Sequence, residues 1–156
     1  MMNELGFYTL AGQPKSPRDL IDEVRTGEAL GLGSAFISER FNVKEAATLS
    51  GAVGAVSTRL GIATAATNHN TRHPMVTAAY AMTMHRLTDG RFSLGLGRGI
   101  APMFKAYGLP KVTTAQLEDF VAQLFDIEAE ARALAEQHHE LAPIFSIKRL
   151  FVQRQA

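Results

Sequence analysis

Phe92-Ser93-Leu94-Gly95-Leu96-Gly97-Arg98-Gly99 is the stretch of this 156-residue sequence that decides the fold. An apolar run, typical of a β-strand, passes directly into a cluster of glycines. Because glycine has no Cβ, a glycine-rich strand end lets the backbone approach a ligand closely. In parallel α/β folds, cofactors bind at the carboxyl ends of the strands. The stretch therefore predicts a ligand site at the end of a parallel strand.

Two other interpretations of the glycine cluster stay open. A dinucleotide-binding fingerprint, G-x-G-x-x-G starting at Gly95, needs a glycine at position 100, where this chain has Ile100. Such a fingerprint also follows the first strand of its fold, whereas this cluster follows the fourth strand-like stretch. The remaining alternative is a plain glycine-rich turn that lets the strand pack closely without any ligand.

Working outward, four strand-like stretches alternate with helix-like stretches. The expected strands cover residues 5–10, 34–38, 60–66 and 92–96. They begin roughly 30 residues apart, which is the length of a βαβ unit. Right-handed crossovers would make all four strands parallel. Pattern alone leaves two architectures open: a compact flavodoxin-like open sheet, and half of a (β/α)₈ barrel, whose complete form needs about 250 residues.

The helix-like stretches carry recognisable start signals. Ser16 followed by Pro17 has the pattern of an N-cap with proline at the first helical position. Pro74 opens a later helix after the third strand. Thr113 with Gln116 three residues on predicts a capping box before a further helix, and a loop is expected between the fourth strand and Thr113.

Composition excludes several classes of function. The chain is 46% hydrophobic and 20% charged, with a formal net charge of +1, so bulk electrostatics favour neither nucleic acid nor an anionic membrane. It has no cysteine, which excludes disulfides, thiolate metal sites and cysteine nucleophiles. The N-terminus lacks the basic start and apolar stretch of a signal peptide, and no apolar run reaches the roughly 20 residues of a membrane helix. We expect a cytoplasmic protein.

Polar side chains follow the second and third expected strands. Glu39 and Arg40 come directly after the second, where Glu39 could accept a proton and Arg40 could hold an anion; the alternative is a surface ion pair that caps the next helix. The run 67–73, which includes Asn68, follows the third strand and either contacts a cofactor or an anion or bonds its own backbone. Its two histidines have a metal-binding spacing only in a helix, and the proline that follows argues against one, so no metal site is expected.

Six segments in this order resemble one family of enzymes, and together they span roughly residues 3–124. The segments are Leu5-Gly6-Phe7-Tyr8, Glu28-Ala29-Leu30-Gly31, Ser38-Glu39-Arg40-Phe41, Arg59-Leu60-Gly61-Ile62-Ala63-Thr64, Arg72-His73-Pro74 and Leu87-Thr88-Asp89-Gly90-Arg91-Phe92-Ser93-Leu94-Gly95-Leu96-Gly97-Arg98-Gly99. The sequence resembles the bacterial luciferase-like flavin monooxygenases, and within them the coenzyme F420-dependent oxidoreductases. The resemblance implies a (β/α)₈ barrel with a flavin or deazaflavin ring at its mouth.

The resemblance also implies site residues. The ring is expected to rest against a bulge in the third strand, often with a non-prolyl cis peptide, which by position falls near Ala63-Thr64. The expected cofactor-binding residues are Phe7, Ala63, Thr64, Asn68, Gly97, Arg98 and Gly99. Glu39 keeps the acidic residue that ends the second strand in the family, but Arg40 replaces the histidine that follows it there. Glu39 and Arg40 are expected to orient a substrate or handle a proton as the catalytic residues.

Length is the main departure from the family. The chain supplies four βα units where a barrel needs eight, so residues 1–124 correspond to the N-terminal half and residues 125–156 to an atypical helical or irregular tail. The site that binds the cofactor phosphate, which in barrels involves the loops after strands seven and eight, is expected to be missing. Half a barrel leaves unpaired edges and an uncovered apolar face. Three alternatives stay open. The chain is a diverged remnant with weak or no activity, or it pairs with another copy to close the barrel, or its tail covers the exposed face.

The leading hypothesis is an oxidoreductase that uses coenzyme F420, or alternatively FMN, for hydride transfer to or from a small organic substrate. The alternative is a non-catalytic half-barrel remnant or interaction subunit. A flavodoxin-like carrier is a weaker option, because it needs a phosphate loop after the first strand, and Pro14 in that loop lacks a backbone donor.

Overall fold

The structure, a computed structural model, describes residues 2–137 and 150–152. These residues form a six-stranded sheet in the order β1-β2-β3-β5-β4, with β6 also paired to β5. The strands are β1 (Met2–Tyr8), β2 (Leu32–Ile37), β3 (Gly61–Thr64), β4 (Thr67–Asn68), β5 (Phe92–Gly97) and β6 (Leu150–Val152). Each of these strand pairings is parallel, which confirms the prediction for the four expected strands, here β1, β2, β3 and β5.

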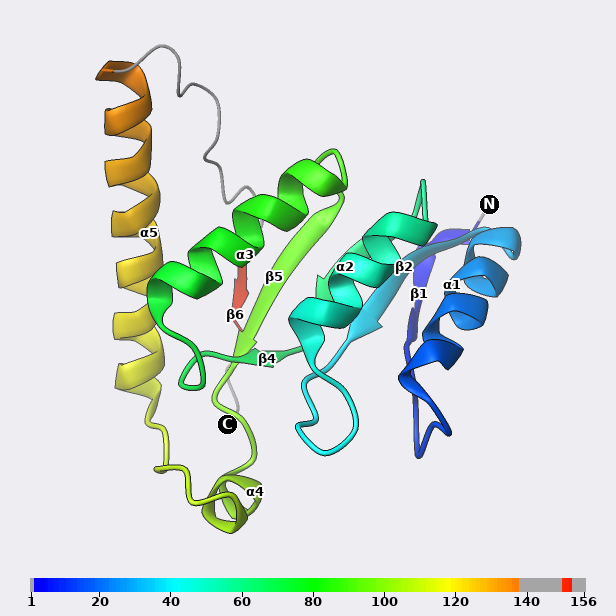
Figure 1. The fold of residues 1–156 in the computed structure, drawn as a ribbon, viewed down its shortest axis with the longest axis horizontal. Helices are drawn as coiled ribbons and strands as arrows, with labels where there is room; N and C mark the ends of the chain where they lie inside the picture. The colour runs from blue at the N-terminus through cyan, green and yellow to red at the C-terminus, as the bar shows by residue number, and fades with distance from the viewer. Residues whose placement is uncertain (1, 138–149, 153–156) are drawn as a thin grey trace.

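The helices follow the order of the strands. They are α1 (Leu20–Ala29), α2 (Ala46–Val56), α3 (Pro74–Leu87), α4 (Ala101–Ala106) and α5 (Thr114–Gln137). Contacts join α1 to α2, α2 to α3 and α3 to α5. In Figure 1, α2 and α3 lie in front of the sheet, while α1 and α5 stand at its two sides. Among the helices of residues 2–137, none combines the length and the apolar character that a membrane crossing requires.

The expected start signals are present at the helix ends. The Ser16 side chain accepts from the Arg18 N–H and opens a short 3₁₀ turn that leads into α1. The capping box before α5 has both of its bonds: the Thr113 N–H donates to Gln116 Oε1 at 2.8 Å, and the Gln116 N–H donates to Thr113 Oγ1 at 3.2 Å. Pro74 is the first residue of α3.

Two elements differ from the expectation. β4 falls inside the polar run that we expected to be a loop, because Thr67 and Asn68 pair with Leu96 and Gly97 of β5. α4 falls inside the segment expected to be a loop before Thr113. Its Phe104 is buried, so tertiary packing stabilises a helix that is too short to show a clear apolar period.

The C-terminal part of the chain is described only in places. Helix α5 runs without a break across residues 124 and 125, where the sequence analysis divides the chain. Of the expected tail 125–156, residues 138–149 and 153–156 lie outside the described residues. β6 lies parallel to β5, with Leu94 paired to Leu150 and Leu96 to Val152.

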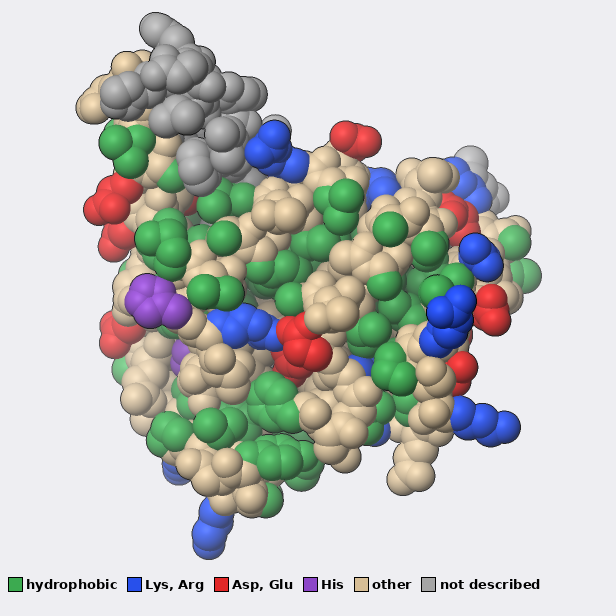
Figure 2. All heavy atoms as spheres, in the orientation of Figure 1, with side chains coloured by type: hydrophobic (Ala, Val, Ile, Leu, Met, Phe, Trp, Pro, Cys, Tyr) green, Lys and Arg blue, Asp and Glu red, His purple; other side chains and the backbone are tan. Residues whose placement is uncertain are grey.

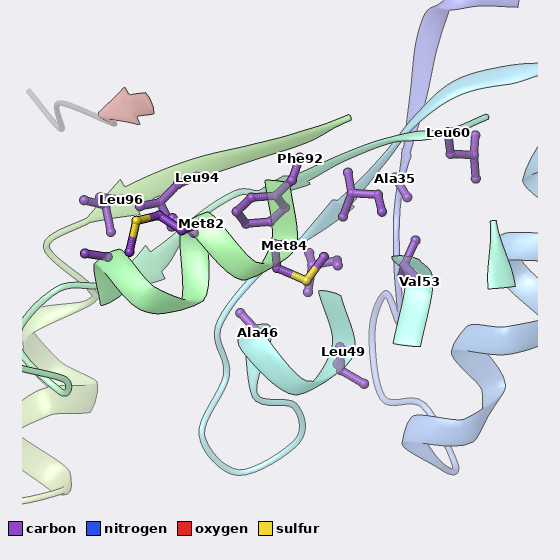
Figure 3. Packing of buried hydrophobic residues seen from close by; sticks show 14 of the residues in the cluster. Ala35, Ala46, Leu49, Val53, Leu60, Met82, Met84, Phe92, Leu94 and Leu96 are labelled. Carbon is purple, nitrogen blue, oxygen red and sulfur yellow. The ribbon is translucent and has the colours of Figure 1, made fainter. Parts of the chain in front are cut away.

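Among the described residues, helices cover one face of the sheet and leave the other open. Figure 3 shows Leu94 and Leu96 of β5 beside Met82 of α3, and Ala46 and Leu49 lie on α2 below them. Because successive side chains on a strand point to opposite faces, the alternate positions lie on the far side of the sheet. There Ser34, Phe36, Ala63, Ser93 and Gly95 border an open hollow of about 310 Å³. An open inner sheet face is what part of a barrel presents.

Candidate functional site

The carboxyl ends of four strands border a pocket of about 430 Å³. Tyr8 ends β1, Ser38 follows β2, Ala65 follows β3 and Gly97 ends β5, and all four residues line the pocket. Because the strands are parallel, their carboxyl ends meet at one edge of the sheet. Protein pockets for small ligands occupy about 300–1,000 Å³. The pocket is therefore large enough for a ring-sized ligand, and its lining includes the glycine-rich end of β5.

A β-bulge interrupts the third expected strand beside this pocket. Ala63 pairs with Ser93 and Thr67 pairs with Leu96, so four steps along one strand face three steps along β5. The peptide bond between Ala65 and Ala66 within the bulge is cis. The bulge thus begins directly after the Ala63-Thr64 position that the resemblance implies.

Ala65, Ala66 and Gly97 form what we call the small-residue wall of the pocket. No side chain in this wall is larger than a methyl group, and Gly97 pairs with Asn68 of β4, which also lines the pocket. Backbone and methyl groups leave room for a flat ring to approach closely. The ends of β3 and β5 are therefore open to the pocket rather than filled by large side chains.

Three aromatic side chains also line the pocket. The rings of Phe41 and Phe104 lie 6.3 Å apart, and those of Phe41 and Tyr107 lie 5.8 Å apart; we call these three residues the aromatic wall. Gly99 has a φ of +75°, and a Cβ there would stand 2.3 Å from Phe104 Cζ, so glycine is required for α4 to pack here. Figure 2 shows hydrophobic side chains gathered over the lower part of the molecule, where Figure 1 places α4.

Polar groups complete the lining. The hydroxyl groups of Tyr8 and Ser38 are hydrogen-bonded to each other. Arg40 Nη1 donates to the Gly12 carbonyl at 2.8 Å, and Arg98 Nη1 donates to Thr114 Oγ1 at 3.0 Å. The two guanidinium groups therefore stand at the rim, each tied to a neighbouring segment.

Glu39 lies at the pocket but its carboxylate is bound by the protein. Oε1 accepts from the Ala46 N–H at 3.1 Å, and Oε2 accepts from Thr67 Oγ1 at 2.7 Å and from Arg72 Nη2 at 3.0 Å. Arg72 also pairs with Glu45, the N-cap residue of α2. Only 1% of the Glu39 side chain is exposed. This arrangement suits a residue that positions the ends of β2, β4 and α2.

Two buried cationic or titratable side chains lie close to the pocket residues. Lys44 Nζ donates to the Thr9 carbonyl at 2.6 Å and lies 4.3 Å from the centre of the Tyr8 ring. Burial, and then the positive charge of Arg40, lower the pKa of Lys44. Burial also lowers the pKa of His69, although a hydrogen bond with the Gly97 backbone acts in the opposite direction.

Six of the nine predicted site residues line the pocket and three lie elsewhere. Those at the pocket are Glu39, Arg40, Asn68, Gly97, Arg98 and Gly99. Phe7 packs against Gly27 of α1, on the helix side of the sheet, and Ala63 borders the hollow of the inner face. Thr64 is buried, and its hydroxyl bonds the backbone of Gly95.

The sequence analysis did not name Tyr8 or the aromatic wall as site residues, and it placed the bulge at Ala63-Thr64, just before the cis Ala65-Ala66 peptide. Tyr8 is one residue from Phe7, and a strand with apolar residues on both faces does not reveal which face meets the pocket. Phe41 lies in one of the segments that carry the resemblance, but its partners are Phe104 of α4 and Tyr107 directly after it, and α4 has no sequence pattern of its own.

Comparison with known proteins identifies a family. The family model for luciferase-like monooxygenases matches residues 2–141. A 5,10-methylenetetrahydromethanopterin reductase from Methanopyrus kandleri is 25% identical over 109 residues, which cover 70% of this chain and 31% of the reductase. The solved structure of a coenzyme F420-dependent tetrahydromethanopterin reductase from the same organism matches with a TM-score of 0.58 and 23% identity, over 68% of this chain and 29% of that one.

Two further solved structures share the fold. An F420-dependent secondary alcohol dehydrogenase in complex with an F420-acetone adduct matches with a TM-score of 0.67 and 20% identity, over 80% of this chain and 41% of that one. The oxygenating constituent of 3,6-diketocamphane monooxygenase from Pseudomonas putida, in complex with FMN, matches with a TM-score of 0.66 and 22% identity, over 81% and 38%.

These likenesses settle the choice between the two architectures. The parallel sheet with helices on one face is part of a (β/α)₈ barrel, not a flavodoxin-like open sheet. The chain spans about a third of the length of the curated reductase that it matches. Because the family model covers most of the sequence, from the first strand into the segment after α5, the chain belongs to the luciferase-like monooxygenase family.

Proposed function

We propose that this chain forms the cofactor-binding part of an oxidoreductase site that transfers hydride between coenzyme F420, or alternatively FMN, and a small organic substrate. The small-residue wall is the observation that carries the proposal, because backbone and methyl groups at parallel strand ends leave a flat surface beside a pocket of ring size. The M. kandleri reductase structure is described as F420-dependent, and the P. putida structure is described as an FMN complex, which supports both cofactors as candidates.

The residues present fit a flat ring system. Ala65, Ala66 and Gly97 would face the ring, and Asn68 and Gly99 would border it. When bound, such a ring supplies the atom that gives or takes the hydride. The protein binds and orients the two reactants and keeps water out, and Glu39 holds the strand ends in place through Arg72 and Thr67. Arg40 and Arg98 at the rim favour anionic groups on a ligand.

The aromatic wall indicates the kind of substrate. Phe41 and Tyr107 are each partly exposed, as are Ile100 and Met103 beside them in the pocket. Burial of apolar surface against these side chains favours a substrate with a sizeable apolar part.

Titration of the purified chain with F420 and with FMN, followed by cofactor fluorescence, tests the proposal. We expect saturable binding of one of them at micromolar strength or better. Ala66→Trp fills the pocket beside the small-residue wall and abolishes that binding. Ala79→Trp places the same side chain on an exposed position of α3 and leaves it unchanged. Absence of binding to either cofactor by a folded chain favours the non-catalytic half-barrel instead.

The same proposal includes a second copy of the chain that closes the barrel. It also includes a boundary after residue 124, between the half-barrel and the tail, and a cytoplasmic location. The observation that favours a partner is the open inner face, where Phe36 is exposed opposite the exposed Tyr8 of the edge strand β1. Light scattering checks the assembly: a molar mass of twice the 16.9 kDa chain supports pairing, and a stable monomer opposes it.

A further inference from the structure

We propose that the hydroxyl groups of Tyr8 and Ser38 form the subsite that binds the oxygen atom of the substrate, a carbonyl compound or the corresponding alcohol. This inference rests on the proposed function and deepens it, since it names the chemical class of the substrate and the side chains that hold it.

Position is the first argument. Tyr8 is the last residue of β1 and Ser38 is the first after β2, and the two strands are paired in register with Tyr8 opposite Phe36. Both side chains line the pocket, and their hydroxyl groups are bonded to each other. Ser38 is buried while Tyr8 is 44% exposed, so the pair reaches from the wall of the pocket to its opening.

The Tyr8 ring is held in place by a buried cation. Lys44 is 3% exposed, and its ammonium lies 4.3 Å from the ring centre. The same ammonium donates to the carbonyl oxygens of Thr9 and Leu10, at 2.6 and 3.4 Å, and so it is fixed to the segment that follows β1. A cation over an aromatic face is attractive, and more so when it is shielded from water. The phenol is therefore presented with little freedom to lose when a ligand binds.

Hydrogen-bond counting gives the ligand class. Each hydroxyl has one proton and accepts through its lone pairs. Whichever hydroxyl donates to the other, one O–H of the pair remains to donate to a ligand, and lone pairs remain to accept from one. A carbonyl oxygen needs the donor, and an alcohol needs the donor and the acceptor together. The pair satisfies both members of such a redox couple without moving a heavy atom.

The aromatic wall complements this subsite. It offers apolar surface for the carbon part of the ligand, while the hydroxyl pair offers the polar contact. Directional polar groups in an apolar pocket are what orient a small substrate. The ligand class is thus an apolar ketone or aldehyde and its alcohol.

The test compares ligands of equal shape in the absence of cofactor. Cyclohexanone, cyclohexanol and methylenecyclohexane are titrated into the purified chain, with binding followed by ligand-observed NMR. We expect the wild-type chain to bind the ketone and the alcohol about fivefold more tightly than the alkene, which is the size of effect expected of one net hydrogen bond. Either single variant, Tyr8→Phe or Ser38→Ala, keeps one O–H donor and part of the preference.

The double variant Tyr8→Phe with Ser38→Ala removes both hydroxyl groups and is expected to bind the three ligands alike. Tyr80→Phe is the matched control, because it removes a phenol hydroxyl that bonds Ser50 between α3 and α2, away from the pocket. A preference that survives in the double variant, or that is absent from the wild type, overturns the subsite. Cofactor titration is a separate measurement. If the wild-type chain prefers the ketone but binds neither F420 nor FMN, the proposed function is contradicted and the subsite is not.

Discussion

The Thr64 hydroxyl makes two hydrogen bonds with the backbone of Gly95: it donates to the carbonyl oxygen at 2.8 Å and accepts from the amide N–H at 2.7 Å. A bulge leaves some backbone N–H and C=O groups without a hydrogen-bond partner on the neighbouring strand. Here the Thr64 side chain serves as the partner of both the N–H and the C=O of Gly95. Thr64 thus stabilises the bulge beside the small-residue wall.

Thr64→Val tests this relationship. It keeps the shape of the side chain but leaves the buried N–H and C=O of Gly95 without a partner, so we expect the free energy of unfolding to fall by about 1–3 kcal/mol. Urea denaturation measures the loss. Thr64→Ser keeps the hydroxyl and is expected to retain most of the stability. Equal stability of the valine variant and the wild type would show that the two bonds contribute nothing.

Glu39→Gln is expected to destabilise the fold by about 3 kcal/mol, because it leaves the largely buried Arg72 guanidinium without the full charge of its buried partner. Thermal unfolding gives the change. Asp22→Asn removes a carboxylate from the exposed Asp22–Arg25 pair and is expected to change stability by less than about 1 kcal/mol. A loss at Glu39 no greater than that of the control would contradict the positioning role.

The fold was largely predictable from the sequence because apolar stretches and capping residues act locally. Thr113 and Gln116 are three residues apart and identify the start of α5 without any tertiary information. The site was less predictable because its contacts join distant segments. Arg72 is 33 residues from Glu39, and the two side chains come together only because the sheet has the parallel order β2-β3-β5-β4.

Face assignment and short elements account for the differences between the predicted site residues and those that line the pocket. In β1, Phe7 and Tyr8 are both aromatic, and the choice of face depends on Gly27 of α1, which leaves space for the Phe7 ring. The aromatic wall depends on α4, a six-residue helix stabilised by the burial of Phe104. Both outcomes are set by packing partners that a linear pattern does not contain.

Acid is expected to destabilise the chain through Glu28. Burial alone would raise the pKa of this carboxyl, but hydrogen bonds from the Arg59 and Thr58 N–H groups and from the Ser57 hydroxyl outweigh it, and the pKa lies below its usual value. The unfolded chain therefore takes up the proton first as the pH falls. The stabilisation is present above the usual carboxyl pKa and is lost as the pH falls through the folded value. Urea midpoints measured between pH 6 and 3 should show a steeper loss in the wild type than in Glu28→Gln.

His69 is expected to add a second dependence at higher pH. Its pKa is lowered chiefly by burial, so the folded state favours the neutral ring that packs 5.2 Å from Phe120. Stability from this group is fully present above about pH 6.5, the usual histidine value, and is lost as the pH falls through the folded pKa. The wild type should therefore lose more stability than His69→Gln between pH 7 and 5. His85→Gln, a change on α3, serves as the control and keeps the wild-type dependence.

Gly99→Ala is expected to disturb the pocket and not only the stability. A methyl group at this position is unfavourable for two reasons. The φ of +75° destabilises an alanine by about 1–2 kcal/mol, and the added Cβ would clash with the Phe104 ring, 2.3 Å away. Relief of the clash requires Phe104 to move, and with it α4 and the aromatic wall. Gly108→Ala provides a matched control, because Gly108 has a φ of +69° with no atom within 4 Å of the added Cβ. We expect both variants to lose about 1–2 kcal/mol of stability in urea from backbone strain, whereas ligand affinity in the cyclohexanone titration falls for Gly99→Ala alone. Equal effects of the two changes on affinity would show that contact between Gly99 and Phe104 does not shape the pocket.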